Sequence, residues 1–442
     1  MLQPSAAMSP VKRSERIVLL DSLRGIAILG ILLVNIRGFG LPYQAVPDPA
    51  VSNDTAGKNF YAWFINEWLI DGNFRALLSM LFGAGMLLFL NRAGKQKTKG
   101  AELFFRRQFW LFLFGFVNIY LFLWFWDILY MYAVCGMVLF AFRRLSVTKL
   151  FIAAIICLVM TDLFDTVELY RQKVIIHKGE TILQPGADSA TFNHDKWTAI
   201  EEYNQFVKKT SLVSKQKEAA SYTQKTNGKF VTLYALHHKL SVDIQSAGFF
   251  TFFFWDILLF MFLGMAFYKK GILTGEVSPG FYWILTLSGL GAGLLLSWFR
   301  LKPIIENDFN DYQIIKNTGV RFYETARTFR ALGFLGLLML LYKSGRLTQL
   351  GSLLQPVGQM ALTNYLMQSI LCGFFFYGIG FGMFGKLERI ELYYVVMIVW
   401  LIQIIFSHVW LHYFLYGPFE WVWRSLTYWK KQPFRKESPS EN

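Results

Sequence analysis

Long apolar runs alternate with short polar segments along most of the 442-residue chain. The runs approach the roughly 20 residues that a helix needs to cross a hydrocarbon core about 30 Å thick. Because no water is available there to bind the backbone polar groups, helices are the expected spanning elements. The pattern therefore predicts an all-α, polytopic membrane helix bundle with about ten transmembrane helices. They are expected at residues 17–36, 74–90, 109–126, 128–143, 148–165, 248–268, 280–299, 327–342, 357–380 and 392–413.

Lysine and arginine gather in alternate connections between these runs. If the spans alternate in direction, every such cluster falls on the same side of the membrane. Because cytoplasmic loops carry the excess of basic residues, both termini are expected in the cytoplasm, and the chain is expected to cross a bacterial plasma (inner) membrane many times. The clusters are Lys12, Arg13 and Arg16; Arg92, Lys95, Lys97, Lys99, Arg106 and Arg107; Arg143, Arg144 and Lys149; Lys269 and Lys270; Lys343 and Arg346; and Arg424, Lys430, Lys431, Arg435 and Lys436.

The composition supports lipid as the surrounding solvent. Apolar residues make up 54% of the chain and charged residues 17%, whereas a typical soluble domain carries about 25% charged residues. The net charge of +15 would suit a nucleic-acid partner. However, membrane topology explains where the basic residues lie, so no nucleic acid is expected. Cys135, Cys157 and Cys372 all fall within predicted spans and are expected to pack as small apolar side chains.

Two polar segments interrupt the bundle on the expected outer side. Residues 38–73 combine a proline-containing loop with the aromatic stretch NFYAWFINEWLI, which would suit a helix lying in the membrane interface. Residues 166–247 form the largest polar block and are expected to be an outer polar loop or a small helical cap. The chain thus divides into an N-terminal five-helix membrane half, 1–165, this outer segment, and a C-terminal five-helix half with a cytoplasmic tail, 248–442.

The first apolar run carries three polar side chains that are unusual inside a membrane. At 100° per residue, Asp21, Arg24 and Asn35 fall within an arc of roughly 60° on one side of the helix. Charged groups within a bilayer usually mark a packed or functional interior, so this face is expected to look into the bundle or into a cavity. Asp21 and Arg24 are one turn apart and can pair, which would lock the helix to its neighbours. Arg24 can instead hold an anionic group such as a phosphate.

Further candidates lie at the expected outer mouth of the bundle. Asp71 and Arg75 flank the start of the second span, where they can form a local ion pair or bind a substrate. Asp127 and Tyr130 begin the fourth span, where Asp127 can cap the helix or act as an acid or base. The candidate catalytic residues are Asp71 and Asp127, and the candidate substrate-binding residues are Asp21, Arg24, Asn35, Arg75, Tyr130, Asn364 and Gln368.

Amides and histidines in the last two runs complete the candidate chemistry. Asn364 and Gln368 lie four residues apart on one helical stripe, where they can join helices through hydrogen bonds or orient a carbonyl or hydroxyl group of a ligand. His408 and His412 have the i, i+4 spacing of a zinc pair but lack the carboxylate of an H-E-x-x-H motif. No metal site and no resident cofactor are expected.

Five stretches resemble YeiB-type bacterial membrane proteins. They are RIVLLDSLRGIAILGILLVNI, FRALLSMLFGAGM, WDILYMYAVCGMVL, QMALTNYLMQSILCGFFFYGIGFGMFGKL and GPFEWVWRSLTYW. That family is grouped with membrane acyltransferases of the acyltransferase-3 and heparan-glucosaminide acetyltransferase type, which share the D-x-x-R-G opening that begins here at Asp21. The resemblance implies a helical membrane fold and acyl-CoA as a possible co-substrate. The acetyltransferase type also implies a histidine between the first two spans, but residues 38–73 contain none.

Two functions remain open on these grounds. The first is transfer of an acyl group from a cytoplasmic acyl-CoA to an outer glycan or lipid acceptor, with Arg24 at the donor end and Asp71 or Asp127 at the acceptor end. The second is a transporter or permease for a small solute, whose path would be lined by the polar face of the first helix. A membrane scaffold is a third possibility.

Overall fold

A computed structural model describes residues 18–95, 100–185, 190 and 192–436. Within these residues the regular secondary structure is helical, apart from one isolated bridge between Phe414 and Arg435. The longer helices are α1 (Val18–Gly40), α3 (Asn73–Lys95), α4 (Gly100–Tyr120), α5 (Leu129–Leu139), α6 (Val147–Ile182), α7 (His194–Thr210), α8 (Leu212–Thr226), α9 (Phe230–Asp243), α10 (Phe254–Lys269), α11 (Pro279–Glu306), α13 (Tyr323–Lys343), α14 (Arg346–Gln359), α15 (Ala361–Phe376), α16 (Leu392–Tyr413) and α17 (Pro418–Tyr428). The short elements are α2 (Gly57–Ile65), α12 (Asp311–Asn317), the 3-10 turns η2 (Tyr43–Ala45), η3 (Pro49–Ser52) and η5 (Phe140–Phe142), and the π-helices η4 (Asn66–Ile70) and η7 (Ile244–Phe253).

Six helical stretches of the described chain are long and apolar enough to cross a membrane. They are Val18–Gly40, Gly57–Arg92, Val147–Ile182, Gly248–Lys269, Pro279–Glu306 and Leu392–Tyr413, and two shorter apolar helices cover Leu129–Phe142 and Ala361–Phe376. The other two predicted spans, 109–126 and 327–342, overlap α4 and α13, which carry several charged side chains. The all-helical architecture with several long apolar helices is therefore confirmed, and the number of ten crossings stays a prediction.

The apolar helices differ in how much of their surface the bundle covers. Of the 18 residues that form the most apolar stretch of α1, 72% are buried. In α6 the corresponding share is 22%. On α6, Ile155, Val159 and Leu163 are all exposed at helical spacing. An apolar face of this kind is expected where a helix meets lipid instead of protein. Helix α1, with its polar residues, thus lies in the interior of the bundle.

Two glycines allow α1 to cross α14 with the backbones in contact. A Cβ atom at Gly25 would lie 2.2 Å from the carbonyl oxygen of Leu354, and one at Gly358 would lie 1.8 Å from that of Asp21. Only glycine permits so close an approach, as in small-residue contacts between membrane helices. The contact fixes the turn of α1 that holds Asp21 against the end of α14.

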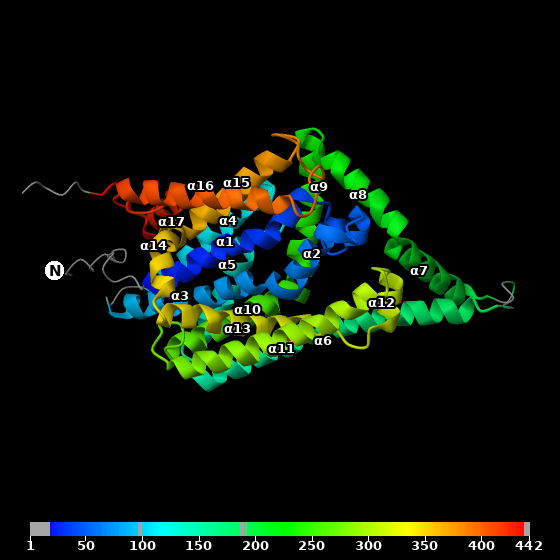
Figure 1. Cartoon of the computed structure of the whole chain (residues 1–442), viewed down its shortest axis with the longest axis horizontal. Helices are drawn as coiled ribbons and strands as arrows, with labels where there is room; N and C mark the ends of the chain where they lie inside the picture. Colours follow the sequence, from blue (N-terminus) through cyan, green and yellow to red (C-terminus); the bar gives the residue numbers. More distant parts are fainter. Residues whose placement is uncertain (1–17, 96–99, 186–189, 191, 437–442) are drawn as a thin grey trace, which may run out of the picture.

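The basic connections gather at one end of the bundle. Lys269 Nζ donates hydrogen bonds to the carbonyl oxygens of Arg143 (3.4 Å) and Leu145 (2.5 Å), which joins the connections after α5 and α10. Helices α14 and α17 lie at the end where the described chain begins, and α7 lies at the opposite end (Figure 1). The predicted basic ends at Lys12, Arg13, Arg16, Lys97 and Lys99 lie outside the described residues.

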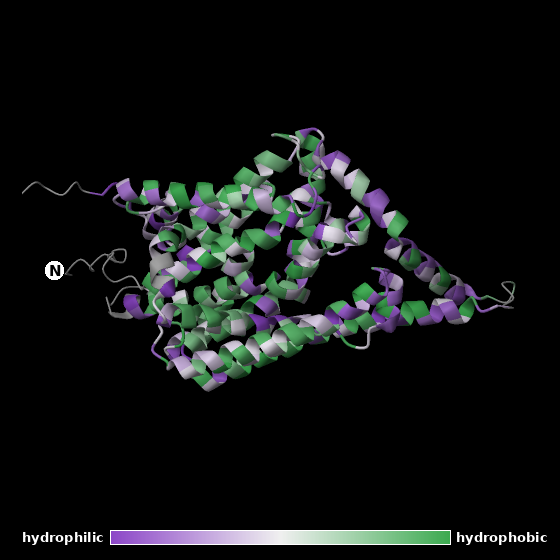
Figure 2. Ribbon diagram, viewed as in Figure 1, coloured by the Kyte–Doolittle hydropathy of each residue, from purple (hydrophilic) through white to green (hydrophobic). Residues whose placement is uncertain are grey.

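The predicted outer segment forms an arch of helices. The fifth predicted span, 148–165, is the first half of α6, which continues to Ile182 before α7 and α8 return toward the bundle (Figure 1). This arch is largely hydrophilic, whereas the bundle is largely hydrophobic (Figure 2). Lys215 Nζ ties α8 down through ion pairs with Asp48 (2.8 Å) and Asp311 (2.5 Å). The described residues of segment 166–247 are therefore largely helical, and the expected domain boundary at residue 165 falls inside α6.

Candidate functional site

A cavity of about 340 Å³ lies among α1, α3, α4, α5, α15 and α17. We call it the arginine-lined cavity. Its volume is at the lower end of the range typical of small-molecule sites, roughly 300–1,000 Å³. Most of its wall is apolar, with lining side chains that include Ile28, Leu78, Leu81, Phe82, Leu111 and Leu129.

Four arginines line the same cavity: Arg24, Arg92, Arg107 and Arg424. Arg24 Nη1 pairs with Asp21 Oδ1 at 2.8 Å, and its side chain keeps 29% of its surface exposed. The Arg107 guanidinium stacks on the Trp423 ring, 3.6 Å from its centroid. Burial, and then the positive charge of Arg424, lower the pKa of Arg107 to about 9. Positive charge is thus concentrated in a low-dielectric site, where an anion would be bound strongly.

The second carboxylate in the cavity wall is engaged in holding α15. Glu420 on α17 accepts hydrogen bonds from the backbone N–H groups of Leu362 (2.7 Å) and Thr363 (3.1 Å), and from Thr363 Oγ1 (2.5 Å). It therefore caps the N-terminus of α15, where a negative charge is favourable. Burial raises the pKa of Glu420. Because this carboxylate caps α15, its negative charge offsets the positive charge of the arginines only in part.

Two tyrosines close the end of the cavity that lies deepest in the bundle. Tyr132 OH hydrogen-bonds with Ser79 Oγ (2.6 Å) and donates to the carbonyl oxygen of Arg75 (3.1 Å). Tyr365 OH accepts a hydrogen bond from the backbone N–H of Ile128 (3.1 Å). Both phenols line the cavity and are buried, so they form a fixed wall.

Asp127 lies directly behind this wall, between α4 and α5. It is 1% exposed, and its carboxylate accepts hydrogen bonds from Asn118 Nδ2 and from the backbone N–H of Tyr130, both at 2.8 Å. Burial raises the pKa of Asp127 to about 7, although these hydrogen bonds oppose the shift. A carboxyl group that titrates near neutrality can take up or release a proton under physiological conditions. Tyr130 contributes its backbone N–H, and its ring packs 5.2 Å from that of Phe112.

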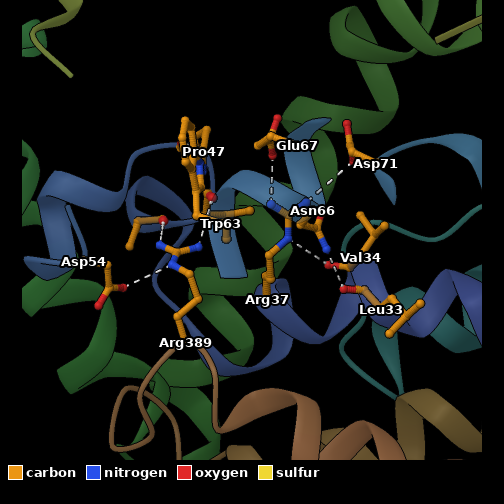
Figure 3. A network of polar contacts seen from close by, with 12 residues as sticks. Leu33, Val34, Arg37, Pro47, Asp54, Trp63, Asn66, Glu67, Asp71 and Arg389 are labelled. Carbon is orange, nitrogen blue, oxygen red and sulfur yellow. Dashed lines mark hydrogen bonds and ion pairs between the residues drawn. The ribbon is translucent and has the colours of Figure 1, made fainter. Parts of the chain in front are cut away.

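A second polar centre lies on the far side of Tyr132, and we call it the ionic cluster. It contains Arg37, Glu67, Asp71, Arg75, Asp256, Arg300, Tyr323, Glu324, Arg327 and Arg330. Arg37 contacts Glu67 Oε1 at 2.8 Å and Asp71 Oδ1 at 3.6 Å (Figure 3). Tyr323 OH donates to the other oxygen of Asp71 at 2.5 Å. Asp71 is thus bound on both oxygens.

The inner half of the ionic cluster surrounds a fully buried arginine. Arg327 pairs with Asp256 and, at 2.6 Å, with Glu324. Arg75 Nη2 lies 2.9 Å from Asp256 Oδ2. The predicted neighbours Asp71 and Arg75 therefore each bind partners from other segments, because Gly72, with φ +77°, turns the chain between them. Such buried charges are tolerated only because each has partners of opposite sign.

The ionic cluster is built on a break between η4 and α3. Helix η4 ends at Ile70, so the carbonyl groups of its last turn have no helical partner. Arg330 donates to the carbonyl oxygens of Glu67 (2.9 Å), Trp68 (2.6 Å) and Asp71 (2.9 Å). Pi-helical segments are frequent at functional sites, and a second one, η7, leads directly into the α10 turn that carries Asp256.

The remaining predicted site residues lie apart from both centres. Asn364 Nδ2 donates to the carbonyl oxygen of Val357 (3.0 Å) and to Ser407 Oγ (2.9 Å). Gln368 Nε2 donates to the carbonyl oxygen of Ile28 (2.9 Å). These amides join α15 to α14, α16 and α1. Asn35 is half-buried on α1, and it lies 14 residues, or roughly 21 Å, along the helix from Asp21. The shared arc of the first helix therefore does not make these residues one site.

Sequence reasoning missed most of the ionic cluster and part of the cavity. Asp256, Arg327 and Arg330 lie in or at the edge of predicted spans, so their charge inside an apolar run was a signal of the same kind as that of Arg24. Arg107 was counted only toward topology. No local pattern connected these residues as a group, because most of their partners lie more than 50 positions away, as for Arg75 and Asp256.

Comparisons with known proteins find a family model and bacterial relatives that are similar to the chain. Residues 267–430 match a family described as protein of unknown function (DUF418). The chain is 28% identical to the uncharacterised protein YxaH of Bacillus subtilis (strain 168), over 98% of this chain and 99% of the relative. It is 29% identical to the uncharacterised protein YeiB of Escherichia coli (strain K12), over 93% of this chain and 96% of the relative. These matches support a YeiB-like family. No solved structure matches the chain.

Proposed function

We propose that the protein binds an acyl-CoA in the arginine-lined cavity and transfers its acyl group to an extracytoplasmic glycan or lipid. The observation that carries this proposal is the convergence of Arg24, Arg107 and Arg424 on an apolar cavity. Acyl-CoA combines the two features that such a site would select, namely phosphate groups and an apolar chain. Arginine suits the phosphates because its planar fork forms paired hydrogen bonds with them.

The cavity volume indicates which part of the donor it would enclose. A cavity of about 340 Å³ holds the pantetheine arm and an acyl group, while the nucleotide remains at the basic mouth. Arg24 lies part of the way along the cavity, because its Nη2 atom is 3.4 Å from the position of a Cβ atom on Gly85. The thioester would lie beside this arginine, and its acyl group would extend toward Tyr132 and Tyr365.

In this proposal Asp127 is the general base. Acting through the hydroxyl group of Tyr365, which contacts Asp127 and lines the cavity, it takes the proton of the acceptor hydroxyl while the new C–O bond forms at the thioester carbonyl. The C–S bond then breaks and the thiol of CoA leaves after gaining a proton. Asp71 is a weaker candidate for this role because Arg37 and Tyr323 already occupy its oxygens. The ionic cluster would hold in place the outer half of the bundle, which the acceptor approaches.

The proposed topology places the mouth of the cavity in the cytoplasm. The positive-inside rule assigns the basic ends of the helices to that side, and the arch of α6–α9 then lies outside. Ten crossings with both termini in the cytoplasm of a bacterial inner membrane satisfy this arrangement. The chain would therefore present its donor site to the compartment that contains acyl-CoA.

One observation favours a transporter as the alternative. Transporters often place binding sites where spanning helices are broken near the middle of the membrane, and the ionic cluster lies at the break between η4 and α3. Release of free CoA thiol distinguishes the two functions. An acyltransferase produces it in proportion to the acylated acceptor, whereas a transporter moves its solute without chemical change.

The experiment that tests the proposal fills the cavity with a single side chain. A Cβ atom at Gly85 would have Arg24 Nη2 as its nearest contact, at 3.4 Å, so Gly85→Leu projects into the cavity without a backbone clash. Gly291→Leu is the matched control, because a Cβ atom at Gly291 on α11 would meet nothing within 4 Å. Calorimetry of the purified protein with acyl-CoA should show binding that Gly85→Leu weakens about tenfold or more, or about 1.4 kcal/mol. Gly291→Leu should bind as the unmodified protein does. Absence of binding by the unmodified protein at millimolar acyl-CoA would refute the proposal.

A further inference from the structure

We infer that Tyr132 sets the maximum length of the acyl chain and that the donors are short- to medium-chain acyl-CoAs. This inference rests on the proposed function, because it concerns the closed end of the same cavity. No sequence motif or relative assigns this role to Tyr132. The argument depends on how far the cavity extends beyond Arg24 and on how firmly its end is closed.

The depth of the cavity beyond Arg24 follows from the lining of α3. Arg24 lies beside Gly85, and Leu78 is the lining residue of α3 farthest from the mouth. Seven residues separate Gly85 from Leu78, which corresponds to roughly 10 Å along the helix axis. A fully extended polypeptide backbone advances about 3.5 Å for every three bonds, or roughly 1.2 Å per bond. An extended alkyl chain advances by a similar distance per bond. The space beyond Arg24 therefore accommodates an acyl chain of about eight carbons.

The wall at this depth is held by three contacts with α3. The hydroxyl group of Tyr132 is bound by Ser79 Oγ and by the carbonyl oxygen of Arg75. Its ring packs edge-on against Phe82, with the centroids 5.4 Å apart. Tyr132 is 3% exposed, so neighbouring side chains resist its rotation. A longer chain would have to displace a tyrosine that makes two hydrogen bonds, which costs about 1 kcal/mol for each bond in addition to the lost packing.

The residues beyond the wall also oppose a longer chain. Arg75, which accepts the Tyr132 hydrogen bond through its carbonyl group, carries its guanidinium to Asp256. An alkyl chain that passed Tyr132 would therefore meet the buried charges of the ionic cluster. Contact with alkyl groups in place of polar partners is unfavourable for such charges. Chain length is thus limited by a rigid aromatic wall and by the polar region behind it.

The experiment compares CoA, acetyl-CoA, octanoyl-CoA and palmitoyl-CoA in binding to the full-length protein. The unmodified protein should bind octanoyl-CoA most tightly and palmitoyl-CoA about tenfold or more weakly. Tyr132→Ala should reduce this preference, because it opens the wall, whereas Tyr132→Phe should retain it. Leu78→Phe narrows the same end and should shift the preference from octanoyl-CoA to acetyl-CoA. This variant adds bulk and leaves Tyr132 in place, so it provides a test even if Tyr132→Ala does not fold.

The outcomes separate this inference from the proposed function. If CoA and every acyl-CoA fail to bind, the proposed function is wrong and the inference falls with it. If the unmodified protein binds octanoyl-CoA and palmitoyl-CoA equally, only the chain-length inference is wrong. The same conclusion follows if Leu78→Phe leaves the chain-length profile unchanged. A preference that shifts as predicted in either variant supports Tyr132 and its surroundings as the determinant of chain length.

Discussion

Replacement of Arg330 by methionine should destabilise the protein strongly, because this side chain holds the break between η4 and α3 together. Arg330 is 1% exposed and donates to three carbonyl oxygens at the break after η4. Arg300 Nη2 also reaches the carbonyl oxygen of Glu67, at 3.2 Å, so two of the three acceptors, those of Trp68 and Asp71, would lose their arginine donor. Each buried acceptor left without a partner costs about 1–3 kcal/mol. The expected loss is about 4 kcal/mol, since the side chain also loses its packing.

The matched control for this prediction is Arg300→Met. Arg300 keeps 20% of its side chain exposed, and the carbonyl oxygen of Glu67 would still be bound by Arg330. We expect a loss of about 1 kcal/mol for this variant. Chemical unfolding of both proteins in the same detergent, followed by tryptophan fluorescence, measures the difference between them. Equal unfolding midpoints for Arg330→Met and Arg300→Met would refute the view that Arg330 holds the broken helix together.

Two further predictions concern Asp127 and the topology. Because Asp127 has a folded-state pKa of about 7, above its ordinary value, its contribution to stability is present at low pH and is lost as pH rises through 7. As a general base it must be ionised, so the rate of CoA release should rise through the same pH range. Asp127→Asn should lower the rate by about 10²–10⁴-fold while donor binding persists, and an unchanged pH profile would contradict the assigned role. For the topology, Lys217→Cys on α8 should react with an impermeant reagent in intact cells, and Lys431→Cys only after permeabilisation. The described native cysteines are buried and give little background. The reverse labelling pattern would overturn the proposed orientation.

The helical architecture could be predicted because it depends on local pattern. Membrane-length apolar runs require helices wherever they occur, and the run at 392–413 coincides with the bounds of α16. The spacing of Asp21 and Arg24 also indicated their contact, since residues three apart lie on one face of a helix. In the structure Arg24 Nη1 lies 2.8 Å from Asp21 Oδ1. The ends of helices were harder to predict where a helix continues from an apolar segment into a polar one. Helix α6 extends to Ile182 because nothing in the sequence after residue 165 breaks it.

The ionic cluster could not be predicted in the same way. Its carboxylates and arginines come from α1, η4, α3, α10, α11 and α13, and the spacing within any one segment does not reveal which charges meet. The glycines give a similar example. Gly83 and Gly85 occupy one short motif, yet a Cβ atom at Gly83 would lie 2.2 Å from the carbonyl oxygen of Met261, whereas at Gly85 it would face the cavity. Only tertiary packing separates a packing glycine from one that leaves room for a ligand.

The arrangement of the two centres explains why α3 carries both of them. Arg75 contributes its carbonyl oxygen to Tyr132, the wall of the arginine-lined cavity, and its guanidinium to Asp256 in the ionic cluster. One turn farther along, Ser79 binds the same tyrosine, and Gly85 then leaves space beside Arg24. A displacement of α3 would therefore change the cavity wall and the ion pairs together. Because packed elements of this kind move as units, occupation of the cavity would be transmitted to the outer half of the bundle through α3. Coupling of this kind would suit a protein that moves an acyl group from one side of a membrane to the other.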